Sequence, residues 1–132
     1  MIGMIAFVRK GRVRDAMAGD APVVGGRTRV GEVAPLVEGG RCAVVIVDAE
    51  RRPIGIVTEE DVKYARERGM LDSPVSMVMR EDPLTAREDE PLDEAIRRME
   101  EAGQPCMPVV DGRQRLVGVL FARRAPAIQA IA

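Results

Sequence analysis

The chain of 132 residues has no histidine and no tryptophan, and it has only one tyrosine and two phenylalanines. Without histidine, it lacks the side chain that most often acts as a general base or binds a metal ion. The scarcity of aromatic residues leaves no stacking platform for single-stranded nucleic acid. A net charge of −1 gives no basic excess to neutralise phosphates, so the composition does not favour nucleic acid as a partner.

Cysteine is scarce as well, with only Cys42 and Cys106 in the chain. Two cysteines without a C-x-x-C pair or a histidine make a poor zinc site, so we expect no metal. Each cysteine lies beside or within an apolar run, which predicts two small buried side chains in a reducing compartment. We therefore expect a cytoplasmic protein.

The N-terminal segment 1–12 begins with an apolar run that is too short to cross a bilayer. Its basic residues follow the run, whereas a signal peptide has them in front. We expect no membrane association, and we interpret 1–12 as an arm or strand that packs on the body of the protein or on a partner subunit.

The strongest feature of the sequence is an internal duplication. Val13 to Met17 recurs as Val75 to Met79, Val44 to Asp48 as Met107 to Asp111, and Pro53 to Val57 as Leu116 to Leu120. The offset is 62 residues for the first pair and 63 for the other two. The chain is therefore divided into a first repeat (13–69), a linker (70–74) and a second repeat (75–132). A unit of this size is marginal alone, so we expect the two to pack together, with a natural ligand site at their junction.

The second repeat has the clearer pattern of secondary structure. Its apolar residues recur at helical spacing, a turn separates two short apolar runs, and glycine follows the helix. The expected elements are an extended piece at Leu84-Thr85, a helix capped by Asp89 or Glu90 with Leu92, Ala95, Ile96 and Met99 on its apolar face and Gly103 after it, strands 106–110 and 116–120, and a final helix 122–131.

The first repeat follows the same order with weaker signals. Gly31 and Pro35 oppose a regular helix over 30–37, so we expect a short or kinked one. Strands are expected at 43–47 and 53–57, with a second helix at 58–68. The strands are apolar at consecutive positions, which indicates that both faces of each sheet are covered, one by helices and the other by the sister sheet. The expected fold class is α/β (α+β), built from two β-α-β-β-α units.

One motif carries candidate chemistry. Gly55-Ile56-Val57-Thr58 closes a predicted strand, and Asp61 follows Thr58 by one helical turn on the same face. A threonine hydroxyl at a helix start can donate to a phosphate, and a carboxylate can accept hydrogen bonds from both hydroxyls of a ribose. The alternative is a capping box, which needs no ligand and which the motif alone favours.

In their order and duplication, these motifs resemble the CBS domain, in the tandem arrangement called a CBS pair or Bateman module. The resemblance rests on Val13-x-x-x-Met17, Val75-x-x-x-Met79, Gly55-Ile56-Val57-Thr58-x-x-Asp61, Pro83-Leu84-Thr85, Pro108-Val109-Val110-Asp111 and Gly118-Val119-Leu120. It implies two repeats packed sheet to sheet about a pseudo-two-fold axis. It also implies two clefts that bind adenosine compounds such as AMP, ADP, ATP or S-adenosylmethionine as regulatory ligands, with no required cofactor.

Carried over by position, the resemblance places Thr58 on a phosphate and Asp61 on the ribose. The residues around the base would be Ile56, Pro83, Leu84, Thr85, Met107 and Pro108, with backbone amides recognising adenine. The second repeat departs from the pattern, because Phe121 and Arg124 stand where the first has Thr58 and Asp61. This predicts one competent cleft and one degenerate cleft. Arg123 and Arg124 are candidate phosphate contacts, or otherwise the solvated start of a helix.

The leading functional hypothesis is a stand-alone regulatory module that binds an adenosine-containing ligand between its repeats. The alternative is a ligand-free dimerisation or partner-docking module. Under both hypotheses we expect a homodimer and an unidentified regulated protein. An enzyme is not expected, because the chain has no nucleophile beside a base and no glycine-rich phosphate loop of the Walker type.

Overall fold

The computed structural model of the chain describes residues 10–39 and 43–122. In chain order the elements are α2 (Val13–Ala16), β1 (Val23–Gly25), α3 (Val30–Val37), β2 (Ala43–Val47), β3 (Pro53–Thr58), α4 (Glu59–Glu67), the 3-10 helix η1 (Val75–Met77), β4 (Arg80–Glu81), β5 (Ala86–Arg87), α5 (Leu92–Ala102), β6 (Cys106–Val110) and β7 (Leu116–Phe121). The expected mixture of helices and strands is confirmed. No helix in the described ranges is long and apolar enough to span a bilayer.

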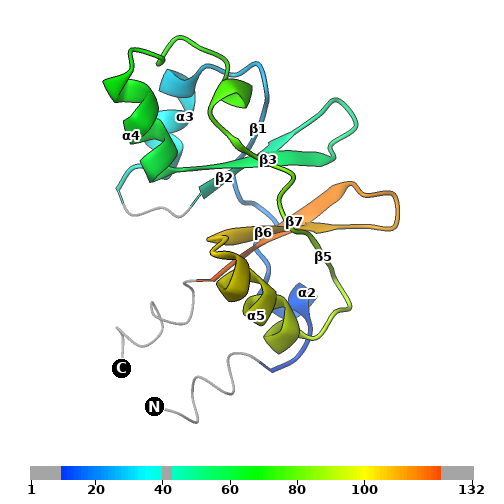
Figure 1. Cartoon of the computed structure of the whole chain (residues 1–132). Coiled ribbons are helices and arrows are strands. Elements are labelled where there is room, and N and C mark those ends of the chain that lie inside the picture. Colours follow the sequence, from blue (N-terminus) through cyan, green and yellow to red (C-terminus); the bar gives the residue numbers. More distant parts are fainter. Residues whose placement is uncertain (1–9, 40–42, 123–132) are drawn as a thin grey trace.

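Two small sheets form the centre of the molecule (Figure 1). The first has the strand order β1-β2-β3-β4 and the second has the order β5-β6-β7. In each sheet a short strand runs parallel to the first strand of an antiparallel hairpin. Val45 pairs with Ile56 in one hairpin and Pro108 pairs with Val119 in the other, which are the same positions 63 residues apart. The duplication in the sequence is therefore a duplication of structure.

Each hairpin is buried on both faces. Val44, Ile46 and Val57 pack beneath α3 and α4 in one core, and Met107, Val109 and Leu120 pack with α5 in a second. The alternate positions of both hairpins meet in a third core, which we call the shared core; its fully buried members are Ala43, Val45, Ile56, Cys106, Leu116 and Val119. The expected sheet-to-sheet packing is thus confirmed. Cys106 is buried as predicted, whereas Cys42 lies outside the described residues.

We call the part of the molecule built on the first sheet the first half, and the part built on the second sheet the second half. The first segment of each repeat packs in the half that is formed mainly by the other repeat. Val13 is fully buried in the core of the second half, where its backbone N–H donates to the Glu90 carbonyl at 3.0 Å. Val75 is fully buried in the core of the first half, where its N–H donates to the Thr28 carbonyl at 2.7 Å. The strand β4 of the second repeat then pairs with β3 of the first. Each half therefore depends on the other repeat for part of its core.

We call the exchanged segments, Val13 to Met17 and Val75 to Met79, the lead segments. Each lead segment passes close to a glycine in a hairpin of the other repeat. A Cβ atom on Gly55 would lie 2.5 Å from the Met79 sulfur and 3.0 Å from the Arg80 carbonyl oxygen. A Cβ atom on Gly118 would lie 2.7 Å from the Met17 sulfur. Because Met17 and Met79 occupy matching positions in the repeats, the same close approach is made twice.

Several local expectations need correction. The extended piece is β5, two residues beyond Leu84-Thr85, because Ala86 and not Leu84 pairs with β6. Helix α5 is capped by neither Asp89 nor Glu90, since Pro91 occupies the N-cap without a side-chain bond. The Glu90 carboxylate instead accepts from the Arg87 backbone N–H at 2.8 Å and pairs with Arg98.

Other local expectations agree with the structure. Helix α3 is short, with eight residues and Pro35 inside it. Gly103 ends α5 in the left-handed conformation, with φ of 65°. The arm at 1–12 lies outside the described residues except for its last three, and the final helix at 122–131 lies outside them except for Ala122.

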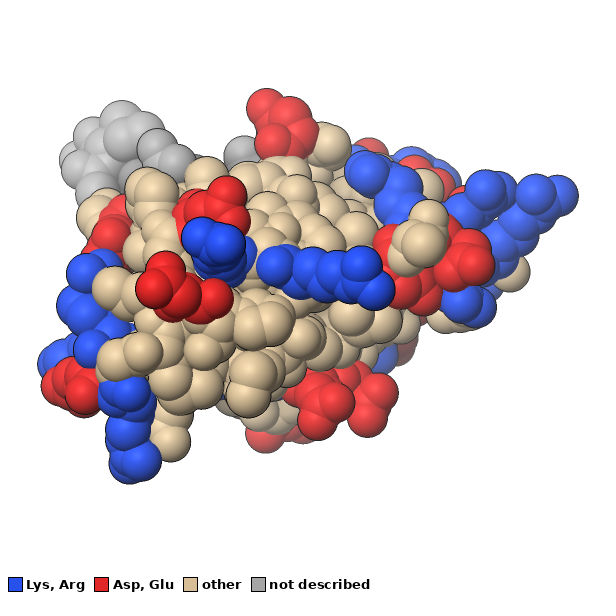
Figure 2. All heavy atoms as spheres, turned by 90° about the horizontal axis from the view of Figure 1, so that it is seen from above, with Lys and Arg blue, Asp and Glu red and all other residues tan. Residues whose placement is uncertain are grey.

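The exterior carries charges of both signs. Figure 2, which views the molecule from the side of α3 and α4, shows acidic and basic side chains interspersed around a broad uncharged area. This face therefore presents no extended basic surface of the kind that attracts nucleic acid.

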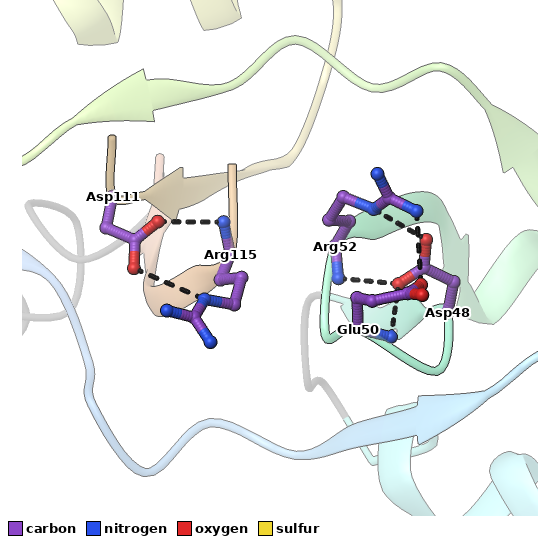
Figure 3. Close-up of polar contacts among 5 residues, drawn as sticks. All are labelled: Asp48, Glu50, Arg52, Asp111 and Arg115. Atoms are coloured by element: carbon purple, nitrogen blue, oxygen red, sulfur yellow. Dashed lines mark hydrogen bonds and ion pairs between the residues drawn. The ribbon is translucent and has the colours of Figure 1, made fainter. Parts of the chain in front are cut away.

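The turns of the two hairpins share one electrostatic arrangement (Figure 3). Asp48 Oδ1 accepts the backbone N–H groups of Glu50 and Arg52, both at 2.9 Å. Asp111 Oδ1 accepts those of Arg113 and Arg115 at 2.8 and 3.0 Å. The backbone hydrogen bond from Arg52 is the main cause that lowers the pKa of Asp48, and those from Arg115 and Arg113 lower the pKa of Asp111.

These lowered pKa values predict an acid-sensitive fold. A carboxylate that titrates lower in the folded state than its ordinary value of about 3.9 stabilises the fold above that pH, and the stabilisation is lost as pH falls through the folded pKa. Substitution of both Asp48 and Asp111 by Asn keeps an oxygen acceptor and removes the titration. We expect the double variant to lose less thermal stability than the parent between pH 5 and pH 3, measured by circular dichroism. Asp72→Asn, at an exposed linker position, serves as the control, and equal losses in all three proteins would contradict the assignment.

The glycine crossing gives a second prediction. Gly55→Ala should destabilise the protein by about 1–3 kcal/mol, because the backbone carbonyl of Arg80 and the Met79 side chain must both move. Gly25→Ala is the matched control in β1, where a Cβ atom meets nothing within 4 Å, and should change stability by less than about 0.5 kcal/mol. Urea unfolding measures both. Equal effects of the two substitutions would show that the close approach of Met79 and Arg80 to Gly55 does not affect stability.

Candidate functional site

Thr58 and Asp61 join the end of β3 to the start of α4. Thr58 is the N-cap of α4, and its hydroxyl accepts the Asp61 backbone N–H at 3.3 Å. Asp61 Oδ2 accepts from both the Thr58 backbone N–H, at 2.8 Å, and the Thr58 hydroxyl, at 3.0 Å. The capping box that the motif alone favours is therefore present. It does not by itself decide whether these groups also meet a ligand.

The direction of these side chains follows from the strand register. Thr58 pairs with Ala43, a member of the shared core, and paired residues of antiparallel strands project to the same face. Ile56, two residues earlier, is fully buried in the same core. Thr58 therefore lies on the face of its sheet that looks toward the second half. The Asp61 side chain stays close to it and keeps 18% of its surface exposed.

A third polar side chain, Arg80 of β4, completes this cluster. Its Nε lies 3.7 Å from Asp61 Oδ2, and 45% of the side chain is exposed. Arg80 pairs with Ile56, so it also leaves the sheet on the face toward the second half. No local motif around Thr58 and Asp61 includes Arg80, because Arg80 belongs to the other repeat. One signal was available: arginine directly follows the repeated Met79, where the first repeat has Ala18.

Of the residues predicted to surround the base, Ile56 and Pro108 lie between the two sheets, and Met107 does not. Ile56 belongs to the shared core, and Pro108 is buried opposite Val119, which is also a member of that core. The structure thus brings Ile56 and Pro108 to the two facing surfaces. The Met107 side chain instead packs in the core with α5, which leaves only its backbone for a ligand at the junction.

The segment 83–85 is held against the start of β6 by Gln104. Its Nε2 donates to the Leu84 carbonyl at 3.0 Å and to the Cys106 carbonyl at 2.9 Å, and its Oε1 accepts the Leu84 N–H at 2.9 Å. Arg98 Nη1 donates to the Thr85 carbonyl at 3.2 Å. These bonds fix the segment that the resemblance assigns to the base. They also engage both backbone groups of Leu84, which is itself 38% exposed.

The matching position in the second half has a different character. Phe121 stands at the position of Thr58 and packs, half-buried, against the shared core. It offers no hydroxyl to a ligand. Arg123 and Arg124 lie outside the described residues, so their predicted phosphate contacts stay predictions. Within the described ranges, no group of three or more acidic or cysteine side chains is placed to hold a metal ion.

The sequence matches a known protein family and several known proteins. The model of the CBS domain matches residues 13–68 and 75–124. An uncharacterized 17.7 kDa protein of Acidianus ambivalens is 30% identical over 81 residues, which span 61% of this chain and 49% of that protein. Inosine-5'-monophosphate dehydrogenase of Methanocaldococcus jannaschii is 33% identical over 78 residues, which span 59% of this chain and 15% of the enzyme. The chain thus corresponds to about half of the first relative and to a minor part of the second.

Solved structures agree on the fold. The CBS domain pair of protein MJ0100, in complex with 5'-methylthioadenosine and S-adenosyl-L-methionine, matches with a TM-score of 0.78 and 24% identity, over 92% of this chain and 97% of that chain. CBSX2 in complex with AMP, a protein of Arabidopsis thaliana, matches with a TM-score of 0.73 and 23% identity, over 92% and 98%. At this level of identity the likeness shows a shared fold.

Proposed function

The chain belongs to the CBS domain family, and from this premise we propose that it is a regulatory module which binds an adenosine-containing ligand beside Thr58 and Asp61. The observation that carries the proposal is the direction of these side chains. The Thr58 side chain leaves β3 on the sheet face that looks toward the second half, and Asp61 Oδ2 lies 3.0 Å from its hydroxyl. A ligand there would contact both halves and stabilise their packing.

The capping bonds leave Asp61 open to a ligand as an acceptor, whereas the single hydroxyl proton of Thr58 is donated to Asp61 Oδ2 and would have to turn to reach a phosphate. All three contacts described for the Asp61 carboxylate converge on Oδ2, and Oδ1 makes no hydrogen bond within the described part of the chain. A carboxylate has about four lone-pair sites on its two oxygens. Ribose hydroxyls can therefore donate to Asp61 while the helix stays capped. The complexes of MJ0100 with 5'-methylthioadenosine and S-adenosyl-L-methionine, and of CBSX2 with AMP, support an adenosine compound as the ligand class.

Ligand binding is tested by thermal unfolding with AMP, ADP, ATP and S-adenosylmethionine. At a hundredfold excess over its dissociation constant, a ligand stabilises the fold by about 2.7 kcal/mol. Asp61→Asn keeps the size of the side chain and an oxygen acceptor but removes the charge that favours hydroxyl donors. We expect a rise in melting temperature with at least one compound in the parent, and a much smaller rise in Asp61→Asn.

Asp72→Asn is the matched control, because it removes the same charge from an exposed linker position. It should keep the parent's response. If none of the four compounds raises the melting temperature of the parent, or if Asp61→Asn responds as the parent does, the proposal fails.

A second candidate function is dimerisation or partner docking without a small ligand. It is favoured by two large apolar side chains on the surface: Tyr64 of α4 is 50% exposed and Met77 of η1 is 66% exposed. Under this proposal the chain forms a homodimer in the absence of nucleotide. We expect twice the monomer mass of 14.4 kDa by light scattering after size-exclusion chromatography. A monomer at micromolar concentration would contradict it.

A further inference from the structure

We propose that Arg80 makes the site selective for an anionic adenosine ligand, that is, an adenine nucleotide in preference to neutral adenosine or to a cationic sulfonium compound. This inference rests on the proposed function, because it concerns the same site. It identifies Arg80 as a specificity-determining residue that the second repeat contributes to a site otherwise built at the end of β3.

The position of Arg80 supports this role. Its pairing with Ile56 directs the side chain to the sheet face that carries Thr58, and its guanidinium lies beside the Asp61 carboxylate. The side chain is 45% exposed, so its remaining donors are open to a molecule from solvent. A guanidinium has five N–H donors in a planar fork that matches a phosphate, and the contact with Asp61 involves only Nε.

The acidic side chains at the start of α4 oppose the attraction that a helix N-terminus exerts on an anion. The first turn of α4 carries three acidic residues, Glu59, Glu60 and Asp61. A phosphate brought beside them would be repelled, whereas a sulfonium would be attracted. Arg80 offsets this acidic field at the carboxylate that faces the ribose. The sign of the charge at position 80 therefore decides which adenosine compound the site prefers.

The other half shows that the fold does not need arginine at this position. Ala18 is the counterpart of Arg80, and it exchanges two backbone hydrogen bonds with Val119, at 2.8 and 3.0 Å. The edge pairing is thus also made by a residue with an uncharged, short side chain. A half-exposed ion pair such as Arg80–Asp61 adds only about 0–1 kcal/mol to stability. Neither packing nor stability accounts for arginine there.

All three polar residues of the site differ from the residues at the matching positions of the other repeat. Thr58, Asp61 and Arg80 have Phe121, Arg124 and Ala18 as counterparts, while Gly55 and Met79 have Gly118 and Met17. The residues that build the crossing are kept and the three polar residues are all replaced. Arg80 therefore groups with Thr58 and Asp61, and not with the framework.

Isothermal titration of the whole chain with AMP, adenosine and S-adenosylmethionine tests the inference. We expect the parent to bind AMP at least about tenfold more tightly than the other two, as a charge-assisted contact allows. Arg80→Ala should lose about tenfold or more in AMP affinity and keep adenosine affinity within about twofold. Arg80→Lys should retain part of the preference, because lysine keeps the charge without the planar fork.

Arg97→Ala, on the exposed surface of α5, removes the same charge elsewhere and should bind as the parent does. Unliganded melting temperatures show whether each variant is folded before titration. Equal affinity of the parent for AMP and S-adenosylmethionine, or an Arg80→Ala variant that keeps the AMP preference, would overturn the role of Arg80. The proposed binding of an adenosine compound would still stand. Failure of all three compounds to bind the parent would overturn the proposed function together with it.

Discussion

The structure depends on the burial of each hairpin from both sides. In the described part of the chain, one face of the β2–β3 hairpin is covered by α3 and α4, and the other packs on the second hairpin. Separation of the sheets would expose a row of apolar side chains on each of them to water, which opposes separation. The exchanged lead segments strengthen the same constraint, because Val13 and Val75 each complete the core of the opposite half. Two units that are marginal alone thus share one core, and a ligand bound across them would depend on how they pack.

The pattern of apolar and turn residues in the sequence predicts those parts of the fold that depend on residues close together in the chain. The hairpin strands, the short α3 and the end of α5 at Gly103 follow from apolar runs, turn residues and a glycine stop. The exchange of lead segments does not follow, since the repeated motif shows where a segment recurs and not which half it enters. The displacement of β5 has a tertiary cause as well: the side chain of Gln104 takes the backbone groups of Leu84, so pairing with β6 begins only at Ala86.

The candidate site was predictable only in part, for a chemical reason. A capping box and a ribose site require the same residue types at the same spacing, so Thr58 and Asp61 alone could not separate them. In the structure the cap uses one oxygen of the Asp61 carboxylate, so the proposed ribose contact does not require the cap to open. Arg80 lies 19 residues beyond Asp61 in the sequence, in the other repeat, and no local motif includes it. Only the pairing of β4 with β3 brings it to the site.

The halves are not equivalent, and one contact shows why a duplicated fold tolerates the difference. The Leu116 N–H donates to the Arg51 carbonyl at 2.9 Å, and Arg51 Nε donates to the Leu116 carbonyl at 3.3 Å. The counterpart of Leu116 is Pro53, which has no N–H, so the reverse bond cannot form. The shared core is retained despite this asymmetry, because burial requires only apolar volume and not identical partners. Polar positions at the rim of the core can thus differ between the halves while the core is kept, so the site proposed beside Thr58 does not require a matching site beside Phe121.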